Sequence, residues 1–422
     1  MNNQPYNNDH ENVETTIYNA KINVPNESEL EAIEYINPLD NPKLRDKRKH
    51  MKKQNKSREE IDKEAQDFVF AQPHKEKKNS KLKKVLLIIL IILLSLIFLL
   101  TSTFFIFKHI GKKSMLDYNN MVINPSPQIE DISNVTNDGK EVTYKGKKYV
   151  FNEEIATVVM MGIDKTADET HKVGSGQADA IYIGIIDNRT KKVSILSVSR
   201  DAMVDVNIYN TKGEFVRTEN QQLCLSYAYG DGSHSSAQNT INSLQRLFYG
   251  MQFNTYFALN YYGLHDINDA VGGVTVTATT DFYSYNQNRI VKKGETITLY
   301  GADAEQYLRT RDLSALDSNT ERMDRQKQYI TTFLSKIVPS AKKDITVITR
   351  LFNSVNANST TNLNTSKLTY LASNALSNID SYKNIEFYNV PGTVVKGEKY
   401  AEFNVDQTAL WELMLDLFYI EQ

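Results

Sequence analysis

An uninterrupted apolar run over residues 85–107 constrains this chain more than any other feature. None of its 23 residues is charged, and as an α-helix it would be roughly 34 Å long, enough to cross the hydrocarbon core of a bilayer. A buried helix of this length and uniformity is rare in water-soluble domains. A cleaved signal peptide does not follow so long a segment. The run therefore predicts a transmembrane helix over residues 85–107.

Lysines flank the apolar run unequally, and the asymmetry predicts its orientation. Six lysines stand between positions 75 and 84, whereas Lys108, Lys112 and Lys113 follow the run. The more basic flank of a membrane helix stays in the cytoplasm. We therefore expect a single-pass protein of the cell membrane, with its N-terminus in the cytoplasm and its C-terminal part outside.

The segment before the run, residues 1–84, shows no sustained apolar period. Acidic residues dominate residues 1–40, and basic residues dominate residues 41–58. Such blocks are typical of solvated, disordered chain, although a basic stretch lying on anionic lipid headgroups is an alternative. We expect a disordered cytoplasmic tail. The net charge of the whole chain, −2, leads us to expect no nucleic-acid partner.

The segment after the run, residues 108–152, is polar and contains two prolines and two glycine turn pairs. This composition is typical of irregular connections. We therefore predict an extracellular stalk or linker, which ends in a β-hairpin formed by residues 141–144 and 148–151.

From residue 153 onward, short β-branched runs alternate with segments of helical period. The strand-like runs are residues 156–161, 180–186, 193–199, 255–259, 274–277 and 385–390, and the helical ones are 236–249, 262–271, 302–308, 320–337 and 406–419. Interleaved strands and helices are typical of α/β folds, in which helices cover a central sheet. We predict one extracellular α/β domain with α-β-α layers over residues 153–420.

Charged residues stand at the ends of three predicted strands. Asp164 follows the first, Asp179 opens the second, and Arg200 follows the third. Ligands of α/β sheets gather outside strand ends, and Mg²⁺ prefers a few carboxylate oxygens together with ligand phosphate. These residues could therefore form a site for a cation and an anion. The alternative is that the two aspartates cap turns.

A second charged group lies downstream. Arg309 and Arg311 end one predicted helix, and Arg322, Arg325 and Gln326 lie in the next. Arg322 and Gln326 are four residues apart and share a helix face. Arginine binds phosphate oxygens through two parallel hydrogen bonds. Surface salt bridges to neighbouring acids are the alternative interpretation.

Other enzyme signatures are absent from the sequence. It contains no G-x-S-x-G, P-loop, H-E-x-x-H or Rossmann glycine motif, and these mark the common hydrolase, nucleotide and zinc sites. The single cysteine, Cys224, excludes an intramolecular disulfide.

Taken in order, these motifs are more specific than any one of them. The series is Met161-Gly162-Ile163-Asp164, Ala178-Asp179, Ser197-Val198-Ser199-Arg200-Asp201, Ser226-Tyr227-Ala228-Tyr229-Gly230, Asp269-Ala270-Val271-Gly272-Gly273-Val274, Arg309-x-Arg311 and Arg322-x-x-Arg325-Gln326. Over residues 150–420 it resembles the LytR-CpsA-Psr family of Gram-positive envelope proteins.

The resemblance implies a Mg²⁺-dependent phosphotransferase, a glycopolymer–peptidoglycan ligase. Such an enzyme transfers an anionic glycopolymer, a teichoic acid or capsule-like polysaccharide, from an undecaprenyl-diphosphate carrier to peptidoglycan and forms a phosphodiester. The implied partners are the lipid-linked polymer, peptidoglycan and membrane lipid. Two alternatives remain open from the sequence: a polyprenyl-pyrophosphate hydrolase, and a non-enzymatic regulator of the envelope or of transcription.

The resemblance also implies roles for individual residues. Asp164 and Asp179 match the acids that bind metal, and Arg200 and Asp179 match the catalytic positions. The residues that match the pyrophosphate site are Arg200, Arg309, Arg311, Arg322 and Gln326.

Three positions depart from the family's usual pattern. Gln177-Ala178 stands where the family commonly has Arg-Ser, so one positive charge facing the pyrophosphate is missing. Ser199 replaces a proline, and Asn319 replaces an acid. We interpret the chain as a divergent member whose substrate or rate differs more than its fold.

Overall fold

The computed structural model describes residues 80–164, 176–231, 234–310, 318–377, 385–398 and 400–422, together with residues 57, 59, 60 and 63. The chain divides into two compact units, Met1–Ile91 and Ile92–Gln422. Most of the predicted cytoplasmic tail lies outside the described residues. The expected disorder of residues 1–84 therefore stays a prediction.

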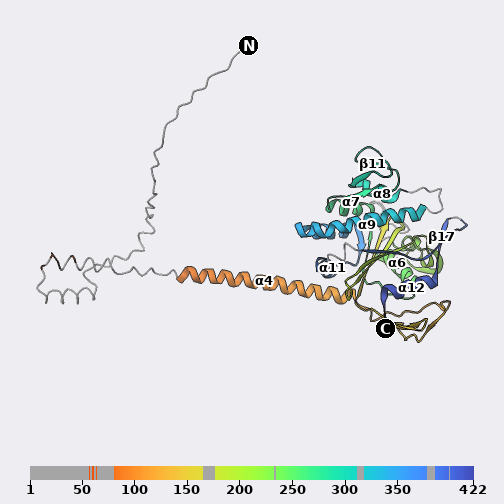
Figure 1. The fold of residues 1–422 in the computed structure, drawn as a ribbon, viewed down its shortest axis with the longest axis horizontal. Coiled ribbons are helices and arrows are strands. Elements are labelled where there is room, and N and C mark those ends of the chain that lie inside the picture. Colours follow the sequence, from red (N-terminus) through yellow and green to blue (C-terminus); the bar gives the residue numbers. More distant parts are fainter. Residues whose placement is uncertain are drawn as a thin grey trace, which may run out of the picture. The chain divides into compact units, whose positions relative to one another are not determined.

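The apolar run forms helix α4, which covers Ser80–Met115 (Figure 1). Among the described residues it is the one helix long and apolar enough to cross a membrane. The helix continues beyond the run to Met115, whose side chain is fully buried. A Cβ added at Gly111 would lie 2.0 Å from the main-chain oxygen of Ser366. The end of α4 therefore packs closely against helix α11, Thr365–Ser377.

The segment that we expected to be a stalk belongs to the folded domain. It contributes Tyr118, Met121 and Ile123 to the main apolar core. Strands β1 (Ile132–Ser133), β2 (Glu141–Tyr144) and β3 (Lys147–Phe151) form an antiparallel sheet with β18 (Tyr419–Glu421) at the C-terminus. The hairpin was predicted, but its partner strand lies far away in the sequence, so local composition carried no sign of it.

The central sheet has six strands in the order β14-β9-β4-β5-β6-β15. Strands β4, β5 and β6 are antiparallel neighbours, whereas β9 runs parallel to β4, and β15 runs parallel to β6. The short edge strand β14 pairs antiparallel with β9. The bounds are Ser359–Thr361 for β14, Tyr256–Leu259 for β9, Ile155–Ile163 for β4, Ala178–Asp187 for β5, Val193–Val198 for β6 and Glu386–Asn389 for β15.

Helices cover both faces of this sheet. Residues along β4 alternate between two apolar clusters, one on each face of the sheet. Val159 and Met161 face the main core, which includes buried residues of α6 (His234–Leu247) and α12 (Gln407–Phe418). Ala156 and Val158 face the opposite side, where they join Met115 of α4 and Tyr370 of α11. The predicted α-β-α layering is confirmed.

A further apolar cluster holds together the elements that carry the downstream arginines (Figure 1). Helix α8 packs on α7, on α9 and on β11, and α9 also packs on β10 and α10. The bounds are Tyr261–Ala270 for α7, Val274–Thr277 for β10, Phe282–Ser284 for β11, Arg289–Val291 for β12, Thr296–Leu299 for β13, Ala302–Arg309 for α8, Ser318–Lys343 for α9 and Thr346–Asn358 for α10.

Two hairpins and a short helix complete the described fold. The first hairpin pairs β7 (Met203–Tyr209) with β8 (Phe215–Gln222), and the second pairs β16 (Gly392–Lys396) with β17 (Ala401–Val405). Helix α5 covers Leu225–Ala228. Strand β8 has no buried residue, so it lacks the apolar alternation by which a strand is predicted.

Candidate functional site

The charged strand ends meet at one edge of the central sheet. Ile163 at the end of β4 pairs with Ala178 at the start of β5. Ile181 of β5 pairs with Val198 at the end of β6. Because β5 runs antiparallel to both neighbours, its start lies beside both of their ends. This topology brings together the polar residues that flank the three strands.

Two hydrogen bonds join Asp164 to the main chain of Gln177. The Asp164 amide donates to the Gln177 carbonyl at 3.1 Å, and the Gln177 amide donates to Asp164 Oδ1. Burial raises the pKa of Asp164, and so does the negative charge of Asp179. The amide of Gln177 and the positive charges of Arg200 and Arg309 oppose that rise. Burial is therefore the main reason that this carboxylate is harder to ionise than usual.

Arg200 forms the centre of the site. Its Nη1 forms an ion pair with Asp179 Oδ1, and its Nη2 donates to Gln177 Oε1 at 2.6 Å. The same Nη2 lies 3.2 Å from Cys224 Sγ, and Nε lies 3.4 Å from Asp201 Oδ1. Four side chains thus enclose the guanidinium group, which is only 13% exposed.

Helix α9 brings Arg322 to the same carboxylate. Its Nη2 donates to the main-chain oxygen of Asp179 at 3.0 Å, and its Nη1 lies 3.7 Å from Asp179 Oδ2. One turn further, Gln326 Oε1 accepts from Tyr182 Oη at 2.7 Å. Arg322 is 5% exposed, so the surface salt bridge that we considered as an alternative does not describe it. Asp179 therefore contacts two arginines from different parts of the fold.

The downstream arginines differ in their surroundings. Arg309 is 54% exposed and pairs with Glu305 of its own helix at 2.5 Å, although its charge also acts on Asp164. Arg311 lies outside the described residues. Arg325 is buried and donates to the main-chain oxygens of Tyr307 and Glu321. These two hydrogen bonds hold Arg325 between α8 and α9, whereas its Nη2 has no hydrogen-bond partner among the described residues.

The donor set fits a hard divalent cation that also binds phosphate. Among the described residues no group of three or more His, Cys, Asp or Glu side chains could hold a metal ion. Asp164 and Asp179 supply two carboxylates, and their repulsion helps to raise the pKa of Asp164. A cation would relieve that repulsion. Mg²⁺ typically takes one or two protein carboxylates and completes its shell with water and phosphate.

Three residues at this edge were not predicted as site residues. Gln177 was noted only as a departure from the family's usual pattern, and Cys224 only as the single cysteine of the chain. Tyr182 was treated as part of a strand. Burial raises the pKa of the Cys224 thiol to about 11, so it is a neutral neighbour of Arg200. Gln177 could have been found, because it stands between the two predicted acids.

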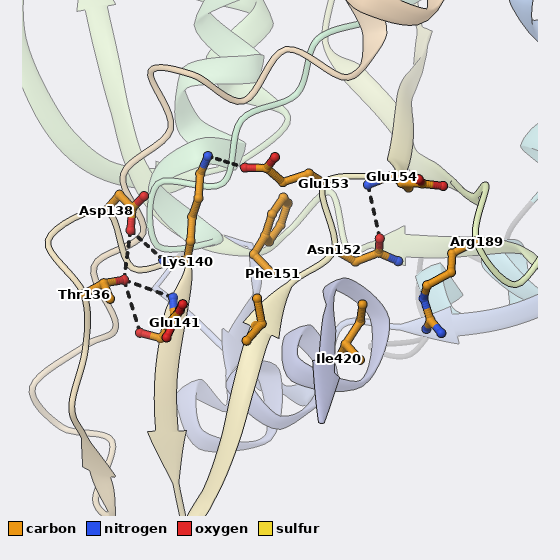
Figure 2. A pocket seen from close by; sticks show the side chains of 11 residues that line it. Thr136, Asp138, Lys140, Glu141, Phe151, Asn152, Glu153, Glu154, Arg189 and Ile420 are labelled. Carbon is orange, nitrogen blue, oxygen red and sulfur yellow. Dashed lines mark hydrogen bonds and ion pairs between the residues drawn. The ribbon is translucent and has the colours of Figure 1, made fainter. Parts of the chain in front are cut away.

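A separate polar pocket of about 550 Å³ lies beside β2 and β3 (Figure 2). None of its lining residues belongs to the predicted site. Figure 2 shows Lys140 pointing to Glu153, and the two side chains pair at 2.6 Å. Asn152 accepts from the amide of Glu154 at 3.1 Å. The pocket's polar side chains bind one another, and the charged edge of the central sheet is the stronger candidate site.

The fold and the site define an α/β domain with carboxylates and arginines clustered at one sheet edge. The LytR_cpsA_psr family model matches residues 122–417, and the chain belongs to this family. The match begins within the segment that we had assigned to a stalk, in agreement with the burial of that segment.

Characterised relatives are similar but distant, and the chain spans less than two thirds of their length. Biofilm regulatory protein A of Streptococcus mutans is 26% identical over 266 residues, which cover 61% of this chain and 62% of that protein. The polyisoprenyl-teichoic acid–peptidoglycan teichoic acid transferase TagU of Enterococcus faecalis is 26% identical over 211 residues, covering 49% and 63%. The crystal structure of protein gbs0355 from Streptococcus agalactiae has a TM-score of 0.51 at 23% identity, with 63% and 86% covered. It supports the fold.

Proposed function

We propose that this protein transfers an anionic glycopolymer from an undecaprenyl-diphosphate carrier to peptidoglycan. The observation that carries the proposal is the cluster of Asp164, Asp179, Arg200 and Arg322 at one sheet edge. Phosphoryl transfer requires positioning and charge neutralisation more than a nucleophilic side chain. The relative TagU is named as a polyisoprenyl-teichoic acid–peptidoglycan teichoic acid transferase, and this name supports the same reaction.

In the proposed reaction, a sugar hydroxyl of peptidoglycan attacks the phosphorus that bears the glycopolymer. A new P–O bond forms, the P–O bond to the bridging oxygen breaks, and polyprenyl phosphate leaves. The hydroxyl proton passes to bulk water. Arg200 and Arg322 would bind the diphosphate oxygens, with Arg309, Arg311 and Gln326 around them. The two guanidinium groups then stabilise the negative charge that develops on the leaving phosphate.

Asp164 and Asp179 would hold Mg²⁺, which when bound neutralises phosphate charge. Asp179 also contacts Arg200 and Arg322. It is therefore placed to link the cation to the arginines. Its negative charge compensates two buried guanidinium groups until an anionic substrate binds.

The membrane helix accords with a carrier that stays in the bilayer. We propose that α4 anchors the protein in the cell membrane with the domain outside, as the flanking lysines indicate. The reaction would then take place where lipid-linked polymer and peptidoglycan are both accessible.

The test is transfer by the full-length protein in detergent. The reaction contains a polyprenyl-diphosphate glycan, soluble peptidoglycan strands and Mg²⁺, and the phosphodiester-linked product is measured. Arg200→Ala should lower kcat/KM by about 10²–10³-fold, the usual effect of losing a group that stabilises transition-state charge. Arg217→Ala is the matched control, because that arginine is 59% exposed and pairs with Glu219 on β8.

Two results would contradict the proposal. One is the absence of linked product from the wild-type protein, and the other is equal activity of Arg200→Ala and Arg217→Ala. Release of free glycan phosphate without linked product would instead identify a polyprenyl-pyrophosphate hydrolase.

A further inference from the structure

Gln177 connects a carboxylate and an arginine that come from different strands. Its main chain exchanges hydrogen bonds with Asp164, which follows β4. Its side-chain oxygen accepts from Arg200, which follows β6, at 2.6 Å. Strands β4 and β6 do not pair with each other, because β5 lies between them. Gln177, just before β5, is thus in contact with both strand ends.

The side-chain contact fixes one end of the Arg200 guanidinium. Asp179 accepts from Nη1, and Gln177 Oε1 accepts from Nη2. Two acceptors on separate terminal nitrogens define the plane of the group. Without Gln177 Oε1, the acceptor left to Nη2 among the described residues would be Cys224 Sγ at 3.2 Å, and a thiol is a weak acceptor.

In this chain the residue at position 177 is a neutral acceptor. The arginine that the family commonly has here could not accept the hydrogen bond of Arg200. A glutamate would accept the bond but would add negative charge beside the phosphate. The amide oxygen of glutamine accepts the bond and leaves the charge of the site unchanged.

We propose that Gln177 is a positioning residue that sets the plane of the Arg200 guanidinium for the diphosphate. The inference rests on the proposed function, because it assigns Arg200 to that ligand. Orientation of a group that stabilises the transition state acts on kcat more than on substrate affinity. Gln177 would therefore act through orientation, and its side chain would add no charge to the substrate.

Three variants separate orientation from charge. Gln177→Ala and Gln177→Met remove the acceptor, and each should lower kcat about 10–100-fold while KM changes less than about threefold. Gln177→Glu keeps the acceptor and adds a negative charge. It should keep kcat within about threefold of wild type and raise KM about tenfold. Gln238→Ala is the matched control, because that glutamine is exposed on α6 and donates to Asn242.

The experiment uses full-length protein in detergent with Mg²⁺ and measures kcat and KM for a polyprenyl-diphosphate glycan. Fluorescence of the single tryptophan, Trp411, establishes that each variant is folded. Calorimetry measures the affinity for inorganic pyrophosphate, which should fall about tenfold in Gln177→Glu and less than threefold in Gln177→Ala.

The outcomes distinguish this inference from the proposed function. Wild-type kcat in Gln177→Ala, or an equal loss of kcat in the Ala and Glu variants, would overturn the positioning role while transfer stands. If wild-type protein transfers nothing, the proposed function fails, and the pyrophosphate affinities decide the inference. Equal affinities in Gln177→Ala and Gln177→Glu would then overturn it, and an affinity of Gln177→Glu at least about threefold below that of Gln177→Ala would support it.

Discussion

Lys367 of α11 is a buried amine whose titration should make folding stability depend on pH. The residue is 5% exposed, and its Nζ donates to the main-chain oxygen of Asn254 at 2.7 Å. Burial lowers the pKa of this amine to about 8 from its usual 10.5. Asn362 also donates to the Asn254 oxygen, at 3.1 Å. Lys367→Met therefore removes the amine and leaves that oxygen with a donor.

The magnitude follows from the difference between the two pKa values. A lowering of about 2.5 units corresponds to about 3 kcal/mol. Between pH 8 and 10.5 the unfolded chain binds more protons at this residue than the folded protein, so stability rises with pH. Below pH 8 the amine is charged in both states, and the full cost remains. Lys367→Met should therefore be more stable than wild type by about 3 kcal/mol at pH 7, with the difference vanishing above pH 10.5.

Urea unfolding at several pH values, followed by Trp411 fluorescence, measures this difference. Trp411 is fully buried and reports on the core. Tyrosines titrate in the same pH range, but their contribution cancels when wild type and variant are compared. Lys342→Met at an exposed position of α9 is the control and should show no such trend. A difference between wild type and Lys367→Met that stays constant from pH 7 to 11 would refute the reasoning.

Three further predictions concern individual contacts. Arg322→Lys should lower kcat/KM by about 10²-fold in the transfer assay, because one ammonium cannot reproduce both contacts to Asp179; wild-type kinetics would contradict this. Arg325→Met should keep kcat/KM within about threefold and change stability in urea by less than about 1 kcal/mol, because the loss of two hydrogen bonds to main-chain carbonyls is offset by removal of a buried charge. Gly111→Val places a Cβ 2.0 Å from the Ser366 oxygen. It should destabilise the packing of α4 on α11 by about 1–3 kcal/mol, measured as faster tryptic cleavage at the two lysines that follow; unchanged cleavage would count against that contact.

Local patterns were sufficient to predict about half of the regular elements of the α/β domain, among them five of the six strands of the central sheet. The β-branched runs around Val158 and Ile183 became β4 and β5, and the helical period around Leu244 became α6. Each pattern is the local consequence of a strand or helix that faces an apolar core. Helices α10 and α11 and the hairpin of β7 and β8 were missed. Strand β8 has no buried residue and therefore no apolar alternation, whereas β7 was missed although four of its seven residues are buried.

The segment 108–152 shows where composition misleads. Its polar residues lie on the outer face of a sheet, whereas Tyr118 and Phe151 are buried and contact each other edge-to-face with ring centroids 5.1 Å apart. Its sheet is completed by β18, at the end of the chain. Only a contact between distant segments decides that this region belongs to the core, and a local window cannot contain such a contact.

The sequence by itself determined the long apolar helix, the α/β class and the residue types of the candidate site. These depend on hydrophobicity, periodicity and the chemistry of single side chains, all of which are local. Tertiary structure decided that Gln177 contacts both Asp164 and Arg200, because β5 pairs antiparallel with both β4 and β6. It also decided that Arg322 reaches Asp179 while Arg325 stays within the protein. The two arginines are three residues apart on α9. Packing of α9 against the sheet and α8 places Arg322 beside Asp179 and Arg325 beside the main-chain oxygen of Tyr307.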